Sequence, residues 1–168
     1  DLGTVTGTAN QTYSVEYTWV EGYEHTGYYN RKYLARRGDE NIGDENLTNP
    51  NNYRAIRYAD VLLMAAEAHS RGGLDEAKAL GYLNQVRERA FGDDTQNVTA
   101  SGAALTDAIL EERRLELMGE GHRFFDLVRT DRAPQAIDGF VAGKHELFPI
   151  PFQEIQFSAG NWSQNPNY

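Results

Sequence analysis

The chain has 168 residues, of which 40% are hydrophobic and 24% are charged, a composition typical of a globular domain and too apolar for intrinsic disorder. Sixteen Lys and Arg residues against 25 Asp and Glu residues give a formal net charge of -9, so we expect no nucleic acid partner. The absence of cysteine excludes disulfides, thiolate metal sites and cysteine nucleophiles.

Residues 1–52 form an aromatic, turn-rich segment that we expect to be mostly loop. Between residues 12 and 20 apolar and polar side chains alternate, which predicts one short, half-buried strand. An exposed aromatic face in this segment would suit a sugar ring, because the C–H groups of a pyranose stack on aromatic rings. The candidates for carbohydrate binding are Trp19, Tyr23, Tyr28 and Tyr29. Packing in the core of a small strand layer is the alternative, and from sequence alone we favour it.

The tetrapeptide Gly-Asp-Glu-Asn occurs twice between residues 38 and 46. Its carboxylates could hold calcium, but the spacing is not that of a calcium-binding loop. We therefore favour a solvated acidic loop over a calcium site.

From residue 53 onwards the hydrophobic period becomes helical, and residues 53–168 are predicted to form a helical region within one domain. One amphipathic helix is predicted to end at Gly72, with an apolar face of Tyr58, Val61, Leu62, Ala65, Ala66 and His69. A second begins after Asp75 and ends at Gly92. The two make a helical hairpin that resembles a tetratricopeptide unit, so the predicted fold class is mainly α with tetratricopeptide-like hairpins.

A third helix is expected to start at Thr106 as its N-cap, with Asp107 in its first turn. Gly119 and Gly121 should end or bend it before a further helix over residues 122–129. The tail, residues 147–168, contains three prolines and is predicted to be extended with at most one helical turn. Its apolar residues suggest that it packs across the helices.

Charged residues on the third helix and around the following corner, with one from the first helix, are predicted to form a structural ion-pair network. Its members are Glu67, Glu112, Arg113, Glu116, Arg123 and Asp126. An anion site or a catalytic acid pair is the alternative, but ladders of this kind are common on helix faces. If Arg113 is buried, a carboxylate such as Glu67 or Asp126 must hold it, because an unpaired buried charge is too costly.

Motifs of metal-dependent, nucleophilic and phosphate-binding enzymes are missing from the sequence. The four histidines form neither His-Glu-x-x-His nor Glu-x-x-His, and a Gly-rich phosphate loop and a Gly-x-Ser-x-Gly elbow are absent. We therefore expect no metal, no cofactor and no catalytic residues.

Five motifs follow one another along the helical region: residues 57–68 (RYADVLLMAAEA), 83–90 (LNQVRERA), 109–117 (ILEERRLEL), 120–129 (EGHRFFDLVR), and 147–151 (LFPIP) with 164–168 (QNPNY). Together with residues 27–33 they resemble the SusD/RagB family of outer-membrane nutrient-binding lipoproteins from Bacteroidetes. The resemblance covers the chain from about residue 27 to the end.

The resemblance implies the C-terminal third of a longer protein that is lipid-anchored and exposed at the cell surface on the outer membrane. Such a protein captures oligosaccharide and passes it to a SusC-like TonB-dependent transporter. The matching motifs are scaffold motifs, so no ligand residue of the family is carried over to this chain. A helical protein-interaction scaffold that binds no sugar is the alternative function.

Overall fold

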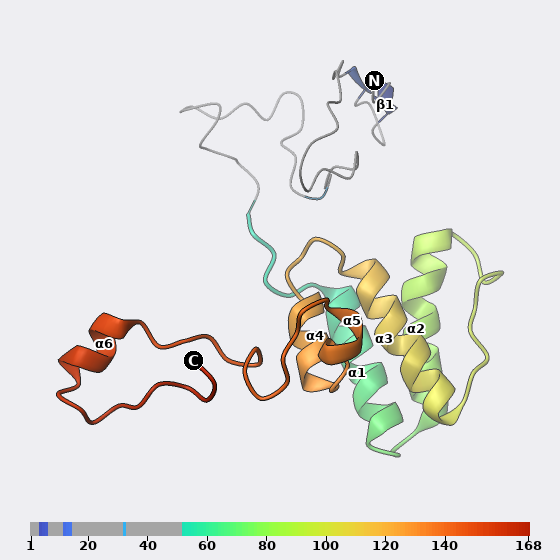
Figure 1. Cartoon of the computed structure of the whole chain (residues 1–168). Coiled ribbons are helices and arrows are strands. Elements are labelled where there is room, and N and C mark those ends of the chain that lie inside the picture. Colours follow the sequence, from blue (N-terminus) through green and yellow to red (C-terminus); the bar gives the residue numbers. More distant parts are fainter. Residues whose placement is uncertain (1–3, 7–11, 15–31, 33–51) are drawn as a thin grey trace. The chain divides into compact units, whose positions relative to one another are not determined.

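The computed structural model describes residues 4–6, 12–14, 32 and 52–168 (Figure 1). The chain divides into two compact units, Asp1–Ile56 and Arg57–Tyr168. The boundary lies close to the predicted change at residues 52 and 53. That the two segments belong to one domain stays a prediction.

In the first unit, the described strands are β1 (Thr4–Thr6) and β2 (Thr12–Ser14), which pair antiparallel with Val5 opposite Tyr13. β2 coincides with the first three residues of the predicted strand, and the remainder of that strand lies outside the described residues. β1 was not predicted, because three residues are too few to display an alternating pattern.

The second unit is built on three helices that lie side by side (Figure 1). They are α1 (Tyr58–Arg71), α2 (Glu76–Phe91) and α3 (Gly102–Glu116). α1 packs against both of the others, and α2 also contacts α3. The prediction of a mainly α fold with tetratricopeptide-like hairpins is confirmed.

Local signals in the sequence set the ends of the first two helices. Gly73 adopts a φ of 61° in the turn after α1, a conformation that glycine reaches without strain. The Asp75 side chain then caps α2 by accepting a hydrogen bond from the Lys78 N–H at 3.0 Å. At the other end, Gly92 ends α2 in the left-handed region with a φ of 88°. All three predicted boundaries, the end of α1 and the beginning and end of α2, are confirmed.

The loop between α2 and α3 is held to α2 by a side-chain amide. Asn84 donates to the Val98 carbonyl at 3.0 Å and accepts from the Val98 N–H at 2.8 Å, as a neighbouring strand would. Arg87 adds a bond of 2.7 Å to the Gln96 carbonyl. The side chains thus take the place of regular secondary structure in satisfying the loop backbone.

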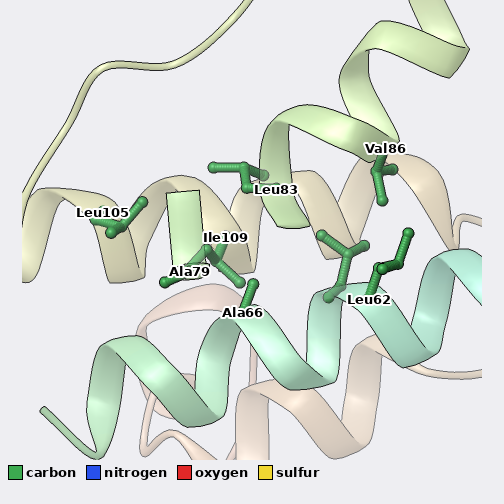
Figure 2. Packing of buried hydrophobic residues seen from close by; sticks show 8 residues of the cluster. Leu62, Ala66, Ala79, Leu83, Val86, Leu105 and Ile109 are labelled. Carbon is green, nitrogen blue, oxygen red and sulfur yellow. The ribbon is translucent and has the colours of Figure 1, made fainter. Parts of the chain in front are cut away.

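The apolar core lies where the three helices meet (Figure 2). Its buried members are Leu62, Leu63, Ala66, Ala79, Leu83, Val86, Leu105 and Ile109. The core therefore ties the hairpin of α1 and α2 to α3, and none of the three helices buries its apolar face alone.

The predicted apolar face of α1 was correct for Leu62 and Ala66, which are buried, but its centre was wrong in phase. Tyr58 is 69% exposed and Val61 is 43% exposed, whereas Leu63, outside the predicted face, is fully buried. The reason is that Asp60 and Glu67 lie on the buried side of the helix. When the buried face of a helix is predicted from hydrophobic residues alone, buried carboxylates are left out. The predicted face of α1 is therefore rotated about the helix axis relative to the face that is buried.

The predicted start of α3 was also wrong. Ser101 is its N-cap, and the Glu76 carboxylate accepts from the Gly102 N–H at 2.8 Å, so a residue of α2 supplies the cap. Thr106 lies inside the helix, where its hydroxyl is 2.7 Å from that of Ser70 on α1. Asp107 consequently lies beyond the first turn and pairs with Arg132.

Three short helices follow: α4 (Arg123–Arg129), α5 (Ala133–Ala136) and α6 (Phe152–Phe157). α4 packs on α3, and α5 packs on α4. The prediction that the tail packs across the helices was wrong for α6, which has no buried residue and contacts no other described helix or strand. The apolar content of the tail could not predict which of its residues are packed and which are exposed.

Candidate functional site

Arg113 is at the centre of a buried ion-pair network that joins three helices. Its Nη1 donates to Asp60 of α1 at 2.7 Å, and its Nε donates to Asp126 of α4 at 2.9 Å. The arginine side chain is only 5% exposed. Two carboxylates thus compensate one buried guanidinium, which holds α1, α3 and α4 at one point.

Arg129 extends the network towards the middle of α1. Its Nε donates to Asp126 at 2.9 Å and its Nη2 to Glu67 at 2.7 Å, while Arg71 also donates to Glu67 at 2.7 Å. Burial by itself would raise the pKa of Glu67, but the hydrogen bonds from Arg129 and Arg71, together with their positive charges, hold that pKa below its usual value. Glu67 is therefore held as a carboxylate.

A second group of ion pairs lies along α3. Arg57, the residue before α1, donates to Glu120 at 2.7 Å and also pairs with Glu116. Arg87 of α2 pairs with Glu112. These contacts link the beginning of α1 and the C-terminal half of α2 to the acidic positions spaced by four along α3 and its following turn.

The structure places the predicted network residues in two groups. Arg113 and Asp126 pair directly, and Glu67 joins them through Arg129 rather than by holding Arg113. Glu112 and Glu116 belong to the second group. Arg123 is exposed and has no salt bridge among the described residues; its charge acts over a longer distance on Glu111.

The six predicted members leave out several residues of the observed network, among them Asp60, Arg57 and Arg87. Asp60 carried a signal, since a single acid within an otherwise apolar stretch of a helix must find a partner when it is buried. For Arg57 and Arg87 the sequence holds no comparable signal, because their partners are 25 or more positions away.

This network fits a structural role better than a catalytic one. Each of its carboxylates faces at least one guanidinium, so none is left poised as a general acid or base. In the part of the chain that the structure describes, His, Asp and Glu side chains form no cluster suited to a metal ion. The helices described there are all too short or too polar to cross a membrane.

A pocket of about 330 Å³ lies between α4 and the residues that follow α5. The rings of Phe124, Phe140, Phe148 and Tyr168 line it together with His145. The His145 Nδ1 already accepts from the Val141 N–H at 3.0 Å, and the Tyr168 hydroxyl donates to the Leu147 carbonyl at 2.8 Å. The pocket is therefore an open, mainly apolar and aromatic depression, whose lining also includes Asp138.

Large apolar side chains also lie exposed along residues 141–168, here called the C-terminal segment. Phe148 is 80% exposed and Phe157 is 82% exposed. The other exposed members are Val141, Leu147, Phe152, Trp162 and Tyr168. Exposed rings at this density are uncommon on the free surface of a monomeric protein.

The predicted carbohydrate-binding residues Trp19, Tyr23, Tyr28 and Tyr29 lie outside the described residues. The doubled acidic loop at residues 38–46 lies outside them as well. Both hypotheses therefore stay predictions.

The family model and the most similar curated proteins point to the same family. The model of the SusD family matches residues 4–145. SusD-like protein P2 of Formosa agariphila is 33% identical over 131 residues, which is 70% of this chain and 26% of the relative. SusD-like protein P25 of the same organism is 35% identical over 120 residues, covering 63% of this chain and 22% of the relative.

Solved structures agree with these sequences. A laminarin-binding SusD-like protein is 42% identical, with a TM-score of 0.74 over 90% of this chain and 31% of that protein. A SusD homolog from Bacteroides thetaiotaomicron is 33% identical, with a TM-score of 0.61 over 70% of this chain and 26% of that protein. The chain thus spans about a quarter of the length of its curated relatives. It spans about a third of the length of the laminarin-binding SusD-like protein.

Proposed function

Because the chain belongs to the SusD family, we propose that it is the C-terminal part of a longer SusD-like receptor that binds glycan at the cell surface. One observation carries this proposal: the similarity, at 42% identity over 90% of the chain, to a protein that binds laminarin. The order of the C-terminal motifs, which ends with residues 164–168, supports the position of the chain within the longer protein.

We propose the aromatic residues of the first unit as the sugar contacts: Trp19, Tyr23, Tyr28 and Tyr29. Their rings would stack on pyranose faces, while neighbouring Asn and Arg side chains could reach the hydroxyl groups. The ion-pair network is not part of this proposal, since its charged groups are committed to one another.

The charge of the chain favours neutral glycans. A net charge of -9 repels uronic and sulfated sugars unless basic residues collect near the site. Capture followed by transfer also requires release, so we expect micromolar to millimolar Kd values, or about -8 to -4 kcal/mol.

In this proposal the receptor is lipid-anchored at the outer membrane and delivers its ligand to a SusC-like TonB-dependent transporter. It performs no chemistry on the glycan. The alternative function is a helical protein-binding scaffold, which the exposed rings of the C-terminal segment favour.

Calorimetry of the whole protein with laminarin and with an acidic polysaccharide tests the proposal. We expect saturable binding of laminarin and weaker or no binding of the acidic polymer. Trp19→Ala should weaken laminarin binding at least tenfold, whereas Tyr58→Ala, which removes an exposed ring from α1, should leave it unchanged.

Two results would count against the receptor. Release of reducing ends in the same tubes would reveal an enzyme, and failure to bind any glycan in a panel would favour the protein-binding scaffold.

A further inference from the structure

His145 closes a short loop in the C-terminal segment through two hydrogen bonds with a single residue. Its backbone N–H donates to the Val141 carbonyl at 3.0 Å, and its ring Nδ1 accepts from the Val141 N–H, also at 3.0 Å. A backbone N–H can only donate, so Nδ1 carries no proton in this arrangement, and the ring proton of the neutral imidazole lies on Nε2. The loop is therefore closed by the uncharged form of His145.

The ring of His145 also ends a row of aromatic contacts that begins on α4. It meets the Phe140 ring edge to face, with 5.7 Å between the ring centroids, and the Phe140 centroid lies 6.5 Å from that of Phe124 in α4. All three rings line the pocket. The hydrogen bonds between His145 and Val141 therefore hold one wall of the pocket in place.

His145 is the residue of this loop that mild acid can charge. Histidine is the side chain whose ordinary change of charge falls between pH 5 and pH 8. The other charged or titratable groups around the ring are Asp138 and Tyr168, which line the same pocket, and Lys144 and Glu146, which are its neighbours in sequence. Side chains of these types ordinarily keep one charge state over that range. α4 contributes the uncharged Phe124 to the pocket lining.

Protonation reverses the role of the ring at Nδ1. The charged imidazole has an N–H at both nitrogens, so Nδ1 of His145 becomes a donor that faces the donor of Val141. Backbone hydrogen bonds, chiefly that from the Gly143 N–H at 3.0 Å, hold the pKa of Glu146 below its usual value. The charge of Glu146 then favours the protonated ring, whereas the Lys144 ammonium opposes it.

We propose that His145 is a pH-dependent latch for one wall of the pocket. The neutral ring holds residues 141–145 closed, and its protonation in mild acid releases the Val141 N–H, so that this loop opens. The remaining bonds of the segment involve no titratable group where Asn167 donates to the Gly143 carbonyl at 2.9 Å and where Gln164 accepts from the Ile150 N–H at 2.7 Å. The opening is therefore local, and it is independent of glycan binding.

Amide hydrogen exchange of the 168-residue chain, followed by NMR, tests the latch. The protection of the Val141 amide is corrected for the pH dependence of intrinsic exchange. It should be about fivefold lower at pH 5.5 than at pH 7.5, the factor that corresponds to the loss of one hydrogen bond of about 1 kcal/mol. The Ile150 amide, which donates to Gln164, is the internal control and should be equally protected at both pH values.

Two substitutions separate the ring proton from the loop itself. His145→Asn places an acceptor oxygen where Nδ1 lies but does not titrate, so the protection of Val141 should become independent of pH. His122→Asn is the matched control, because His122 is a partly exposed histidine before α4 whose side chain makes no capping hydrogen bond. It should leave the fivefold change intact.

Four results would overturn the latch. They are a Val141 amide that is unprotected at pH 7.5, protection that does not change with pH, a parallel loss of protection at Ile150, and a pH dependence that persists in His145→Asn. The third result would mean that acid loosens the whole segment rather than the loop that His145 closes. No glycan enters these measurements, so they can fail while glycan binding holds, and the reverse.

Discussion

The helical bundle and the C-terminal segment each close a loop with one side-chain amide, but in different surroundings. In the bundle, Asn84 pairs with the backbone of Val98; in the segment, Gln164 pairs with that of Ile150, again 14 positions away. The Asn84 pair lies beside an apolar core, whereas the residues that the Gln164 pair encloses include an α6 without a buried residue. An amide can therefore specify the path of a chain, but only packing removes apolar surface from water.

The two regions also differ in how they use charge. The bundle buries Arg113 between carboxylates and places Glu67 against two arginines. Buried pairs of this kind tolerate few alternative arrangements, because each loss of a partner strands a charge. The C-terminal segment has few charges and many exposed rings, so it can accept an apolar partner at little electrostatic cost.

The largest effect is expected from breaking the buried charge cluster of the bundle. Arg113→Ala leaves Asp126 and Asp60 without their shared guanidinium and should lower the free energy of unfolding by about 3 to 5 kcal/mol. This change in the free energy of unfolding is measured by urea denaturation, with circular dichroism at 222 nm as the signal. Arg114→Ala, which removes an exposed pair with Glu111, should cost about 0.5 kcal/mol. Equal effects of the two changes would mean that burial of the pair is unimportant.

A truncation in each region should separate packed from exposed apolar residues. Leu83 is fully buried, and Leu83→Ala should destabilise the bundle by about 3 kcal/mol through lost transfer energy and the cavity left behind. Phe157→Ala removes a larger side chain that is 82% exposed and should change the stability of the 168-residue chain by less than about 0.5 kcal/mol. Thermal unfolding of both variants tests the contrast, and a large loss for Phe157→Ala would show that its ring is already packed.

The parts of this fold that the sequence predicts are those with local causes. Glycine turns and the Asp75 cap determine where α1 ends and where α2 begins and ends, and each can be recognised within a few residues. The start of α3 has no such local cause, because Glu76, 26 positions away, supplies the cap. The phase of α1 failed because Asp60 on its buried face is neutralised by a residue from another helix.

The candidate sites also contain features that the sequence predicts and features that depend on how distant residues pack. A need for carboxylate partners of Arg113 could be predicted from the cost of burying a charge, but the choice of Asp60 over Glu67 depends on how α1 and α3 pack. The hydrogen bonds of Gln164 and Asn165 to the backbone of the C-terminal segment could not be predicted, since Gln and Asn side chains bond to backbone groups wherever the chain brings them close. The aromatic sugar contacts stay predictions.

Removing the hydrogen bonds between Gln164 and Ile150 should loosen the C-terminal segment and leave the bundle unchanged. Gln164→Ala deletes both hydrogen bonds to Ile150, each worth about 1 kcal/mol net, so the Ile150 amide should exchange with deuterium about tenfold faster. Gln156→Ala, at an exposed position of α6, is the control. Faster exchange in α2 as well would contradict the independence of the two regions.

The smallest effect on the free energy of unfolding is expected from the titration of Glu67 in the bundle. Since the arginines hold the pKa of Glu67 below its usual value, the stability that its ionised form contributes is fully present above the unfolded pKa of about 4.5. It is lost as the pH falls through the lower, folded pKa. The free energy of unfolding should therefore fall less steeply between pH 5 and pH 3 in Glu67→Gln than in the unmodified chain.

Because this carboxylate is buried, the difference in slope should persist in 0.5 M NaCl, which screens exposed pairs. Identical slopes would show that the ion pairs of Glu67 with Arg129 and Arg71 do not stabilise the folded chain. The buried network would then contribute no more stability at this position than an exposed ion pair does.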